Sequence, residues 1–298
     1  MSGDTPAAGV WRFDAIGTTW QIETPAALEP RVRLEVTAAI DAFDREWSRF
    51  RDDSGVSHLA REGGGIGAPR DAHDMLEAYA ALDAATAGAV NPLVARSLEA
   101  LGYDATYSFT ARDPEPAPAG WRDLVTWDGG TLAVTEPLLL DVGALGKGRL
   151  VDIVAGILSR AAITTFVVDA GGDLVVRGAA QRIGLEHPFD TRRAIGVWEV
   201  TDAALCASAT NRRAWGDGLH HVLDARTGAP VQTMAATWAV ADTAMHADAI
   251  ATALFFDGGP AIAHAWGVSW VRMFTDGSVE WSHGCRAELF TRTASVGR

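Results

Sequence analysis

The sequence has few cysteines and few basic residues. Among its 298 residues only Cys206 and Cys285 are cysteines, so at most one disulfide could form and a disulfide-based scaffold is excluded. Lys and Arg number 25 against 38 Asp and Glu, which gives a formal net charge of −13. Because nucleic-acid surfaces need clustered cations to neutralise phosphates, we expect no nucleic-acid partner.

The sequence also shows no pattern typical of a membrane span or of an export signal. No window approaches about 18 uncharged apolar residues, since the best candidate, 151–158, contains Asp152 and is soon followed by Arg160. The first residues, MSGDTPAAGVWRFDAIG, show no basic region before an apolar one and no lipobox cysteine. We therefore expect no membrane span, reduced thiols and a cytoplasmic location.

The residues that are present predict a globular chain, because 48% of them are hydrophobic and only 21% are charged. Apolar spacing predicts helices over 26–50 and 71–86. Alternation over 11–24 predicts one strand, with a bulge or close approach at Gly17. We expect a single domain over 1–298, with a Pro-rich surface loop and a lobe junction near 111–123.

The second half of the chain is rich in predicted strands. Hairpins are expected over 164–178, turning at Gly171-Gly172-Asp173, and over 267–283, turning at Asp276-Gly277. Further strands are expected at 194–200 and 236–242, and a helix at 246–255. Helices grouped early and strands grouped late predict an α+β fold with largely antiparallel sheets.

The segment Asp-Val-Gly-Ala-Leu-Gly-Lys-Gly (141–148) joins an apolar run to a helical pattern. Its glycines would let backbone N–H groups approach an anion at the helix N-terminus. Lys147 opposes the helix dipole there unless an anion lies nearby. The same residues fit an ordinary strand-to-helix turn, and they match neither the Walker nor the Rossmann pattern.

The segment 245–256, MHADAIATALFF, places two oxygen-bearing side chains four residues apart. On a helix Asp248 and Thr252 share one face and could hold a hard cation. The alternative is that Asp248 caps the helix and Thr252 bonds back to the carbonyl four residues earlier.

Two more segments carry polar residues, and each segment has two interpretations. His220 and His221 lead into a turn, and alternation along a strand would direct one of them toward the core. Ser208 leads into Arg212 and Arg213, which fit either a phosphate contact or a solvated basic face.

Seven segments occur in an order that resembles the ApbE family, the FAD:protein FMN transferases (flavin transferases). They are AIGTTWQI, EWSRFRDDSGVSHLA, GAVNPLV, DVGALGKGRLVD, VVDAGGDLVVRG, HHVLDARTGAPV and HADAIATAL. The resemblance implies an ApbE-like, T-fold-related α+β fold, with mixed, largely antiparallel sheets, packed helices and an FAD/Mg²⁺ site between lobes. It also implies Mg²⁺-dependent transfer of the FMN moiety of FAD, through a phosphoester bond, to a Thr or Ser hydroxyl of an acceptor flavoprotein, with release of AMP.

The resemblance also assigns site residues. Its metal ligands fall on the carbonyl of Ala144 and the side chains of Asp248 and Thr252. Its FAD contacts fall on Ile16, Phe50, Ala89, Val90, Asn91, Asp141, Lys147, Ser208 and Val222. Lys147 would offset charge during the reaction, and we name His221 and Asp224 as hypothetical general bases.

The chain departs from the family pattern at several positions. Ala207-Ser208-Ala209 stands where the family usually has Thr-Ser-Gly, Phe50 replaces a stacking Tyr, and Val90-Asn91 replaces Phe-Asp. Two alternatives follow: an Mg²⁺-dependent FAD pyrophosphatase giving FMN and AMP, or a non-catalytic FAD-binding protein.

Overall fold

A large antiparallel sheet forms the centre of the protein in this computed structural model, which describes residues 9–290. Every neighbouring pair of strands in the sheet is antiparallel. The strand order is β1 (Gly9–Ala15), β2 (Thr18–Thr24), β6 (Phe166–Asp169), β7 (Asp173–Arg177), β10 (Ala204–Ala209), β15 (Met234–Ala241), β16 (Ser269–Phe274) and β17 (Val279–Trp281).

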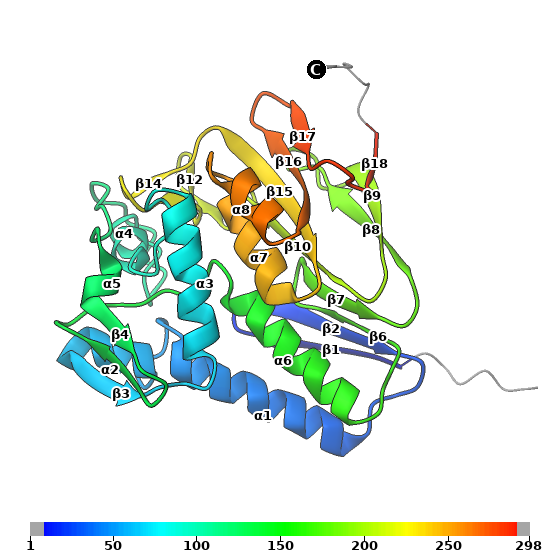
Figure 1. Ribbon diagram of the computed structural model, residues 1–298, viewed down its shortest axis with the longest axis horizontal. Helices are drawn as coiled ribbons and strands as arrows, with labels where there is room; N and C mark the ends of the chain where they lie inside the picture. The colour runs from blue at the N-terminus through cyan, green and yellow to red at the C-terminus, as the bar shows by residue number, and fades with distance from the viewer. Residues whose placement is uncertain (1–8, 291–298) are drawn as a thin grey trace, which may run out of the picture.

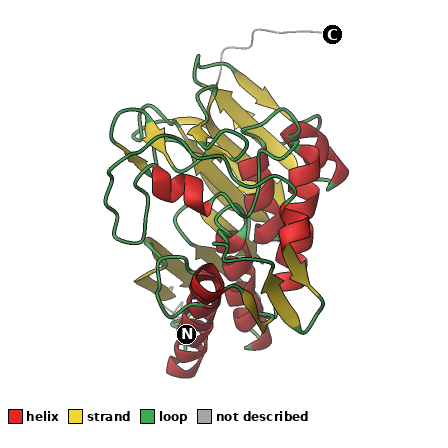
Figure 2. Ribbon diagram, turned by 90° about the vertical axis from the view of Figure 1, so that its left-hand side faces the viewer, coloured by secondary structure: helices red, strands yellow, loops and turns green. Residues whose placement is uncertain are grey.

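Helices cover one face of this sheet (Figure 1). The view turned by 90° shows the same separation of helices from strands (Figure 2). The helices are α1 (Pro30–Trp47), α3 (Ala72–Ala85), α6 (Gly146–Arg160), α7 (Ala244–Ala253) and α8 (Gly259–Ala265). Their apolar faces join one core with the sheet residues on that side.

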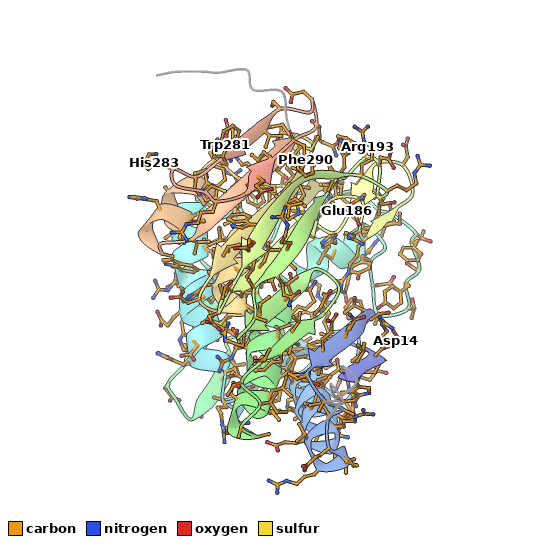
Figure 3. All side chains as sticks on the ribbon, turned by 90° about the vertical axis from the view of Figure 1, so that its right-hand side faces the viewer. Asp14, Glu186, Arg193, Trp281, His283 and Phe290 are labelled. Atoms are coloured by element: carbon orange, nitrogen blue, oxygen red, sulfur yellow. The ribbon has the colours of Figure 1, made fainter. Side chains whose placement is uncertain are left out.

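A small sheet covers the other face of the large one. Its strand order is β18 (Glu288–Leu289), β9 (Ala194–Val200) and β8 (Gln181–Glu186), and Figure 3 shows β8 and β9 crossing in front of the main strands. Side chains of β7 point alternately to the two faces of the large sheet. Val175 belongs to the core on the helix side, while Leu174 and Val176 belong to the core under the small sheet.

The remaining elements are short helices and the strands of small sheets. They are α2 (Gly55–Glu62), β3 (Gly64–Gly67), α4 (Ala95–Ala100), α5 (Trp121–Leu124), β4 (Val125–Trp127), β5 (Thr131–Val134), β11 (Ala214–Trp215), β12 (Leu219–His220), β13 (Leu223–Asp224) and β14 (Ala229–Pro230). The expected α+β class with largely antiparallel sheets is confirmed. No helix in the described part of the chain has the length and apolar character needed to cross a membrane.

The close contact of α6 with α7 sets the geometry of the site. A Cβ at Gly148 would overlap the carbonyl oxygen of Ala244 and the Cβ of Asp248, so only glycine allows the two helices this close. Asp152 of α6 accepts from the backbone N–H groups of Ala244 and Met245, at 2.8 and 2.9 Å. The carboxylate thereby satisfies two of the free N–H groups at the start of α7.

Two details differ from the sequence-based expectation. The segment 11–24 is a hairpin rather than one strand, because Ile16 and Gly17 both have positive φ, 45° and 74°, as a two-residue turn requires. The Pro-rich segment ends before Trp121, which is fully buried at the start of α5 rather than part of a surface loop.

Candidate active site

One cavity of about 1030 Å³ is lined by residues of the main sheet, of α1, α3, α6 and α7 and of the connecting loops. It is large enough for a dinucleotide-sized ligand. All site residues predicted from the sequence line it except Asp224. They are Ile16, Phe50, Ala89, Val90, Asn91, Asp141, Ala144, Lys147, Ser208, His221, Val222, Asp248 and Thr252.

Oxygen atoms from two distant segments meet at the start of α6. The hydroxyl of Thr252 donates to the carbonyl of Ala144 at 3.2 Å, and Asp248 Oδ2 accepts from the N–H of Gly148 at 2.9 Å. The capping alternative is wrong, because Thr243, whose hydroxyl accepts from the N–H of His246, is the N-cap of α7. Thr252 likewise donates across to Ala144 rather than back along its own helix.

Lys147, in the first turn of α6, is paired rather than free. Its Nζ lies 2.7 Å from Oδ2 of Asp173, a fully buried residue at the start of β7. Burial would lower the pKa of Lys147, but the negative charges of Asp173 and Asp248 outweigh it and raise that pKa. The lysine is therefore a fixed cation in the cavity wall.

Asp248 lies near a second carboxylate, that of Asp173 behind the cavity wall. Burial, and then the charge of Asp173, raise the pKa of Asp248 well above its usual value, and Lys147 compensates only in part. A bound cation would favour the ionised form of Asp248. This part of the cavity wall is thus short of positive charge.

The donor set suits Mg²⁺. The Ala144 carbonyl, the Asp248 carboxylate and the Thr252 hydroxyl are all hard oxygen donors, and Mg²⁺ is commonly held by one or two carboxylates together with waters and substrate phosphates. Within residues 9–290 no group of three or more His, Cys, Asp or Glu side chains could hold a metal by itself. The residues present fit Mg²⁺ in a site that a phosphate ligand would complete.

Aromatic rings also line the cavity, those of Phe50, Tyr103 and Tyr107 among them. Phe50 stacks on Tyr107, with ring centroids 5.3 Å apart and planes 4° apart, and meets the edge of Tyr103 at 5.6 Å. Tyr103 stacks in turn on Trp215 at 5.2 Å. The guanidinium carbon of Arg49 lies 4.1 Å from the Phe50 centroid. This wall offers flat apolar surface and a cation.

The loop that carries Asp141 is held by neighbours on both sides. Oδ2 of Asp141 accepts from Arg49 Nε at 2.7 Å, and Oδ1 accepts from the N–H of Gly143 at 2.6 Å. The hydroxyl of Tyr79 donates to the Asp141 carbonyl and accepts from the N–H of Ala144, at 3.0 and 3.2 Å. The two bonds of Tyr79 fix the backbone that presents the Ala144 carbonyl.

The histidine pair divides as alternation predicts. His220 is buried, and its Nε2 lies 2.9 Å from the Val231 carbonyl. His221 lines the cavity, and its buried Nδ1 has no hydrogen-bond partner among the described residues. Burial, followed by the positive charge of Arg213, lowers the pKa of His221 to about 3. The His221 imidazole is therefore neutral at pH 7.

Two predicted residues have their polar groups engaged elsewhere. Asp224 pairs with Arg226 at 2.6 Å in the β13–β14 turn and does not line the cavity. Asn91 lines it, but its amide donates to the Pro118 carbonyl and accepts from the Leu93 N–H, both at 2.9 Å. Asn91 thus ties the Pro-rich segment to the cavity wall.

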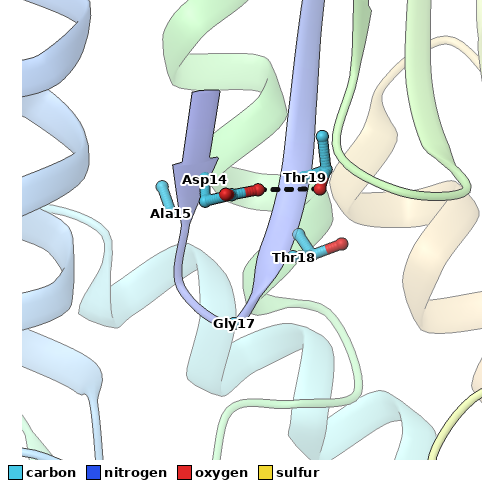
Figure 4. Close-up of a pocket in the computed structure, with 5 residues that line it drawn as sticks. All are labelled: Asp14, Ala15, Gly17, Thr18 and Thr19. Carbon is cyan, nitrogen blue, oxygen red and sulfur yellow. Dashed lines mark hydrogen bonds between the residues drawn. The ribbon is translucent and has the colours of Figure 1, made fainter. Parts of the chain in front are cut away.

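A smaller cavity of about 400 Å³ adjoins the first at the β1–β2 turn (Figure 4). It is lined by Asp14, Ala15, Gly17, Thr18 and Thr19, of which the last two and Gly17 also line the large cavity. Asp14 Oδ1 accepts from the Thr19 hydroxyl across the hairpin at 2.7 Å. The turn therefore forms part of the wall of both cavities.

Sequence reasoning missed three charged residues that shape the site: Arg49, Asp152 and Asp173. For Asp173 a signal existed, because an aspartate within a continuous buried strand pattern needs a charged partner. Arg49 and Asp152 sit in ordinary helical or loop patterns, and only the tertiary structure brings their partners to them.

Comparison with known proteins identifies relatives of this chain. The sequence profile of the ApbE family matches residues 16–267. The FAD:protein FMN transferase of Vibrio cholerae serotype O1 is 28% identical over 280 residues, 84% of this chain and 82% of the relative. That of Klebsiella pneumoniae is 26% identical over 289 residues, 86% and 82% of the two chains.

Solved structures share the fold. The ApbE protein of Thermotoga maritima superimposes with a TM-score of 0.80 at 23% identity, over 93% of this chain and 97% of that one. The flavin transferase ApbE of Vibrio cholerae gives a TM-score of 0.75 at 22% identity, over 92% and 97%. Because the family profile spans most of the chain and the architecture is the same, the chain belongs to the ApbE family.

Proposed function

We propose that this protein is an Mg²⁺-dependent FAD:protein FMN transferase that moves the FMN moiety of FAD to a Thr or Ser hydroxyl of an acceptor flavoprotein. The carrying observation is that the Ala144 carbonyl, Asp248 and Thr252 meet beside Lys147 in the wall of one large cavity. The names of the relatives, FAD:protein FMN transferase, support the same assignment.

The proposed reaction is a phosphoryl-type transfer. The acceptor oxygen forms a bond to the FMN phosphorus, the bond from that phosphorus to the bridging oxygen breaks, and AMP leaves with the bridging oxygen. Such reactions depend mainly on positioning and on electrostatic stabilisation. The oxygens of Ala144, Asp248 and Thr252 would hold Mg²⁺, which supplies charge neutralisation at the pyrophosphate when bound.

The chain's own residues divide the remaining work. Lys147, fixed by Asp173, places a permanent positive charge beside the pyrophosphate. His221 is the candidate base for the acceptor hydroxyl, because it lines the cavity and its Nδ1 is free among the described residues; its pKa of about 3 makes it a weak base until the negative charge of a bound ligand raises that pKa. Asp224 is the weaker candidate, since its carboxylate is engaged by Arg226.

One assay tests the proposal against its rivals. The protein is incubated with FAD, Mg²⁺ and a recombinant, unmodified flavoprotein domain that carries one Thr acceptor site. AMP is measured by chromatography and covalent flavin by fluorescence of a denaturing gel. AMP together with a fluorescent acceptor band supports transfer.

The other outcomes are equally definite. AMP with free FMN and no labelled band, including with the domain in excess, would replace transfer by FAD hydrolysis. FAD binding without AMP would leave a non-catalytic flavin-binding protein and would overturn both enzymatic assignments.

A further inference from the structure

We propose that Arg49 binds the isoalloxazine ring of FAD through the two terminal N–H groups of its guanidinium and so decides which ring of the dinucleotide lies against the aromatic residues around it. The choice of FAD as the ligand rests on the proposed function. The role of Arg49 rests on its own surroundings.

Arg49 is a buried cation with unused donors. Its side chain is 2% exposed, and only its Nε is paired, with Asp141 Oδ2 at 2.7 Å. Nη1 and Nη2 are buried and find no hydrogen-bond partner in the part of the chain that the structure describes. Buried donors of a charged group are costly to leave unpaired. Because Arg49 lines the cavity, a ligand acceptor is the natural partner.

The surroundings of Arg49 indicate a planar ligand. Its guanidinium carbon lies 4.1 Å from the Phe50 centroid and 5.2 Å from that of Tyr103, and Tyr107 stacks on Phe50. Aromatic side chains are the usual platform for a flat heterocycle. The charges beside Lys147 suit the pyrophosphate, so we assign the aromatic residues around Arg49 to one of the two rings of FAD.

The free donors distinguish between those rings. A guanidinium with two neighbouring N–H groups reads two adjacent acceptors, as it does on the O6/N7 edge of guanine. The pyrimidine part of isoalloxazine offers such pairs, a carbonyl oxygen beside a ring nitrogen. The corresponding edge of adenine combines an amino donor with an acceptor and is matched by Asn or Gln instead. The isoalloxazine ring therefore fits Arg49 better than adenine does.

Asp141 has a supporting part in this arrangement. One of its oxygens accepts from Arg49 Nε and the other from the Gly143 N–H. It therefore fixes the guanidinium at the cavity wall and acts as a positioning residue for Arg49.

Binding measurements on ligand fragments test the proposal without any acceptor protein. Calorimetric affinities for riboflavin, FMN, ADP and FAD are compared among the wild type, Arg49→Met and Arg49→Lys. We expect both variants to bind riboflavin, FMN and FAD about tenfold or more weakly and ADP unchanged, because lysine keeps the charge but not the two-pronged geometry. Arg45→Met is the matched control, since Arg45 pairs with Asp41 at the same 2.7 Å but lies on the exposed face of α1.

The fragments separate the possible failures. Equal weakening of ADP and riboflavin, or weakening of ADP alone, would overturn the assignment to isoalloxazine, and so would unchanged binding of all four ligands. If Arg49→Met does not fold, Arg49→Lys carries the test, because it can keep the ion pair with Asp141. A wild type that binds no FAD would instead refute the proposed function.

Discussion

Two ion pairs border the same cavity, each with one buried partner, and they differ in the groups that they lack. Lys147 with Asp173 and Arg49 with Asp141 both have N–O distances of 2.7 Å. The first pair has Asp248 as an additional carboxylate and is short of positive charge. The second sits among aromatic rings and is short of acceptors. A ligand with a metal-bound pyrophosphate and a carbonyl-bearing ring would satisfy both.

Removing Asp248 should have the largest effect, because it takes away the carboxylate of the expected metal site. We expect Asp248→Ala to lower Mg²⁺-dependent AMP release by on the order of 100-fold or more, because the only carboxylate of the expected metal site is lost. The ligand-free variant should lose little stability, because removing a buried carboxylate is favourable and opposes the loss of its hydrogen bond from the Gly148 N–H. AMP assays and thermal unfolding check both; the control is Asp257→Ala, an exposed aspartate beyond α7. Unchanged activity would refute the metal site.

Removing the lysine from the first ion pair should cost stability as well as activity. Lys147→Met leaves Asp173 buried without its partner, which typically costs about 3–5 kcal/mol. The double variant Lys147→Met/Asp173→Asn should recover most of that stability but no AMP release. Urea unfolding and the AMP assay separate the two effects. Recovery of activity in the double variant would show that Lys147 has only a structural role.

The close contact between α6 and α7 predicts a smaller loss of stability. Gly148→Ala should destabilise the protein by about 1–3 kcal/mol, because its Cβ would overlap α7. Gly156→Ala in the same helix is the matched control, because its Cβ would meet only the flexible end of Arg160 at 3.3 Å. That control should gain roughly 0.5–1 kcal/mol. Equal effects in urea unfolding would contradict the packing argument.

The last expected effect is a pH dependence of stability from His221. Its pKa is about 3 in the folded protein and about 6.5 in the unfolded chain, so the unfolded state binds the extra proton between these values. Stability should therefore fall as pH decreases from 6.5 toward 3, by up to about 1.4 kcal/mol per pH unit from this group. His221→Gln should be flatter than the wild type in urea unfolding at pH 7.5 and 5. Parallel profiles would contradict the burial of a neutral His221.

Local pattern predicted the long helices and several strands of the main sheet, but not the short elements and not the reason for the glycines. Periodicity located α1, α7 and the hairpins at 171–173 and 276–277. Gly148 was expected to bring backbone close to an anion, whereas its missing Cβ lets α6 touch α7. A sequence pattern shows that a close approach is required, but it does not show what approaches.

The motifs predicted the residues of the candidate site, but they did not predict the ion-pair partners of those residues. Resemblance placed Ala144, Asp248 and Thr252 together, and the structure brings these atoms into contact or onto one cavity wall. The partners of the cations, Asp173 for Lys147 and Asp141 for Arg49, were not predicted, because each pairing joins segments far apart in the chain.

The most direct test of the account is calorimetric titration of ADP and of riboflavin, each with and without Mg²⁺. If the cavity residues around Lys147 and those around Arg49 are complementary to the two parts of FAD, Mg²⁺ should tighten the binding of ADP and leave riboflavin unchanged. Asp248→Ala should remove the effect of Mg²⁺ on ADP. Mg²⁺-dependent binding of riboflavin, or ADP binding indifferent to Mg²⁺, would contradict the account.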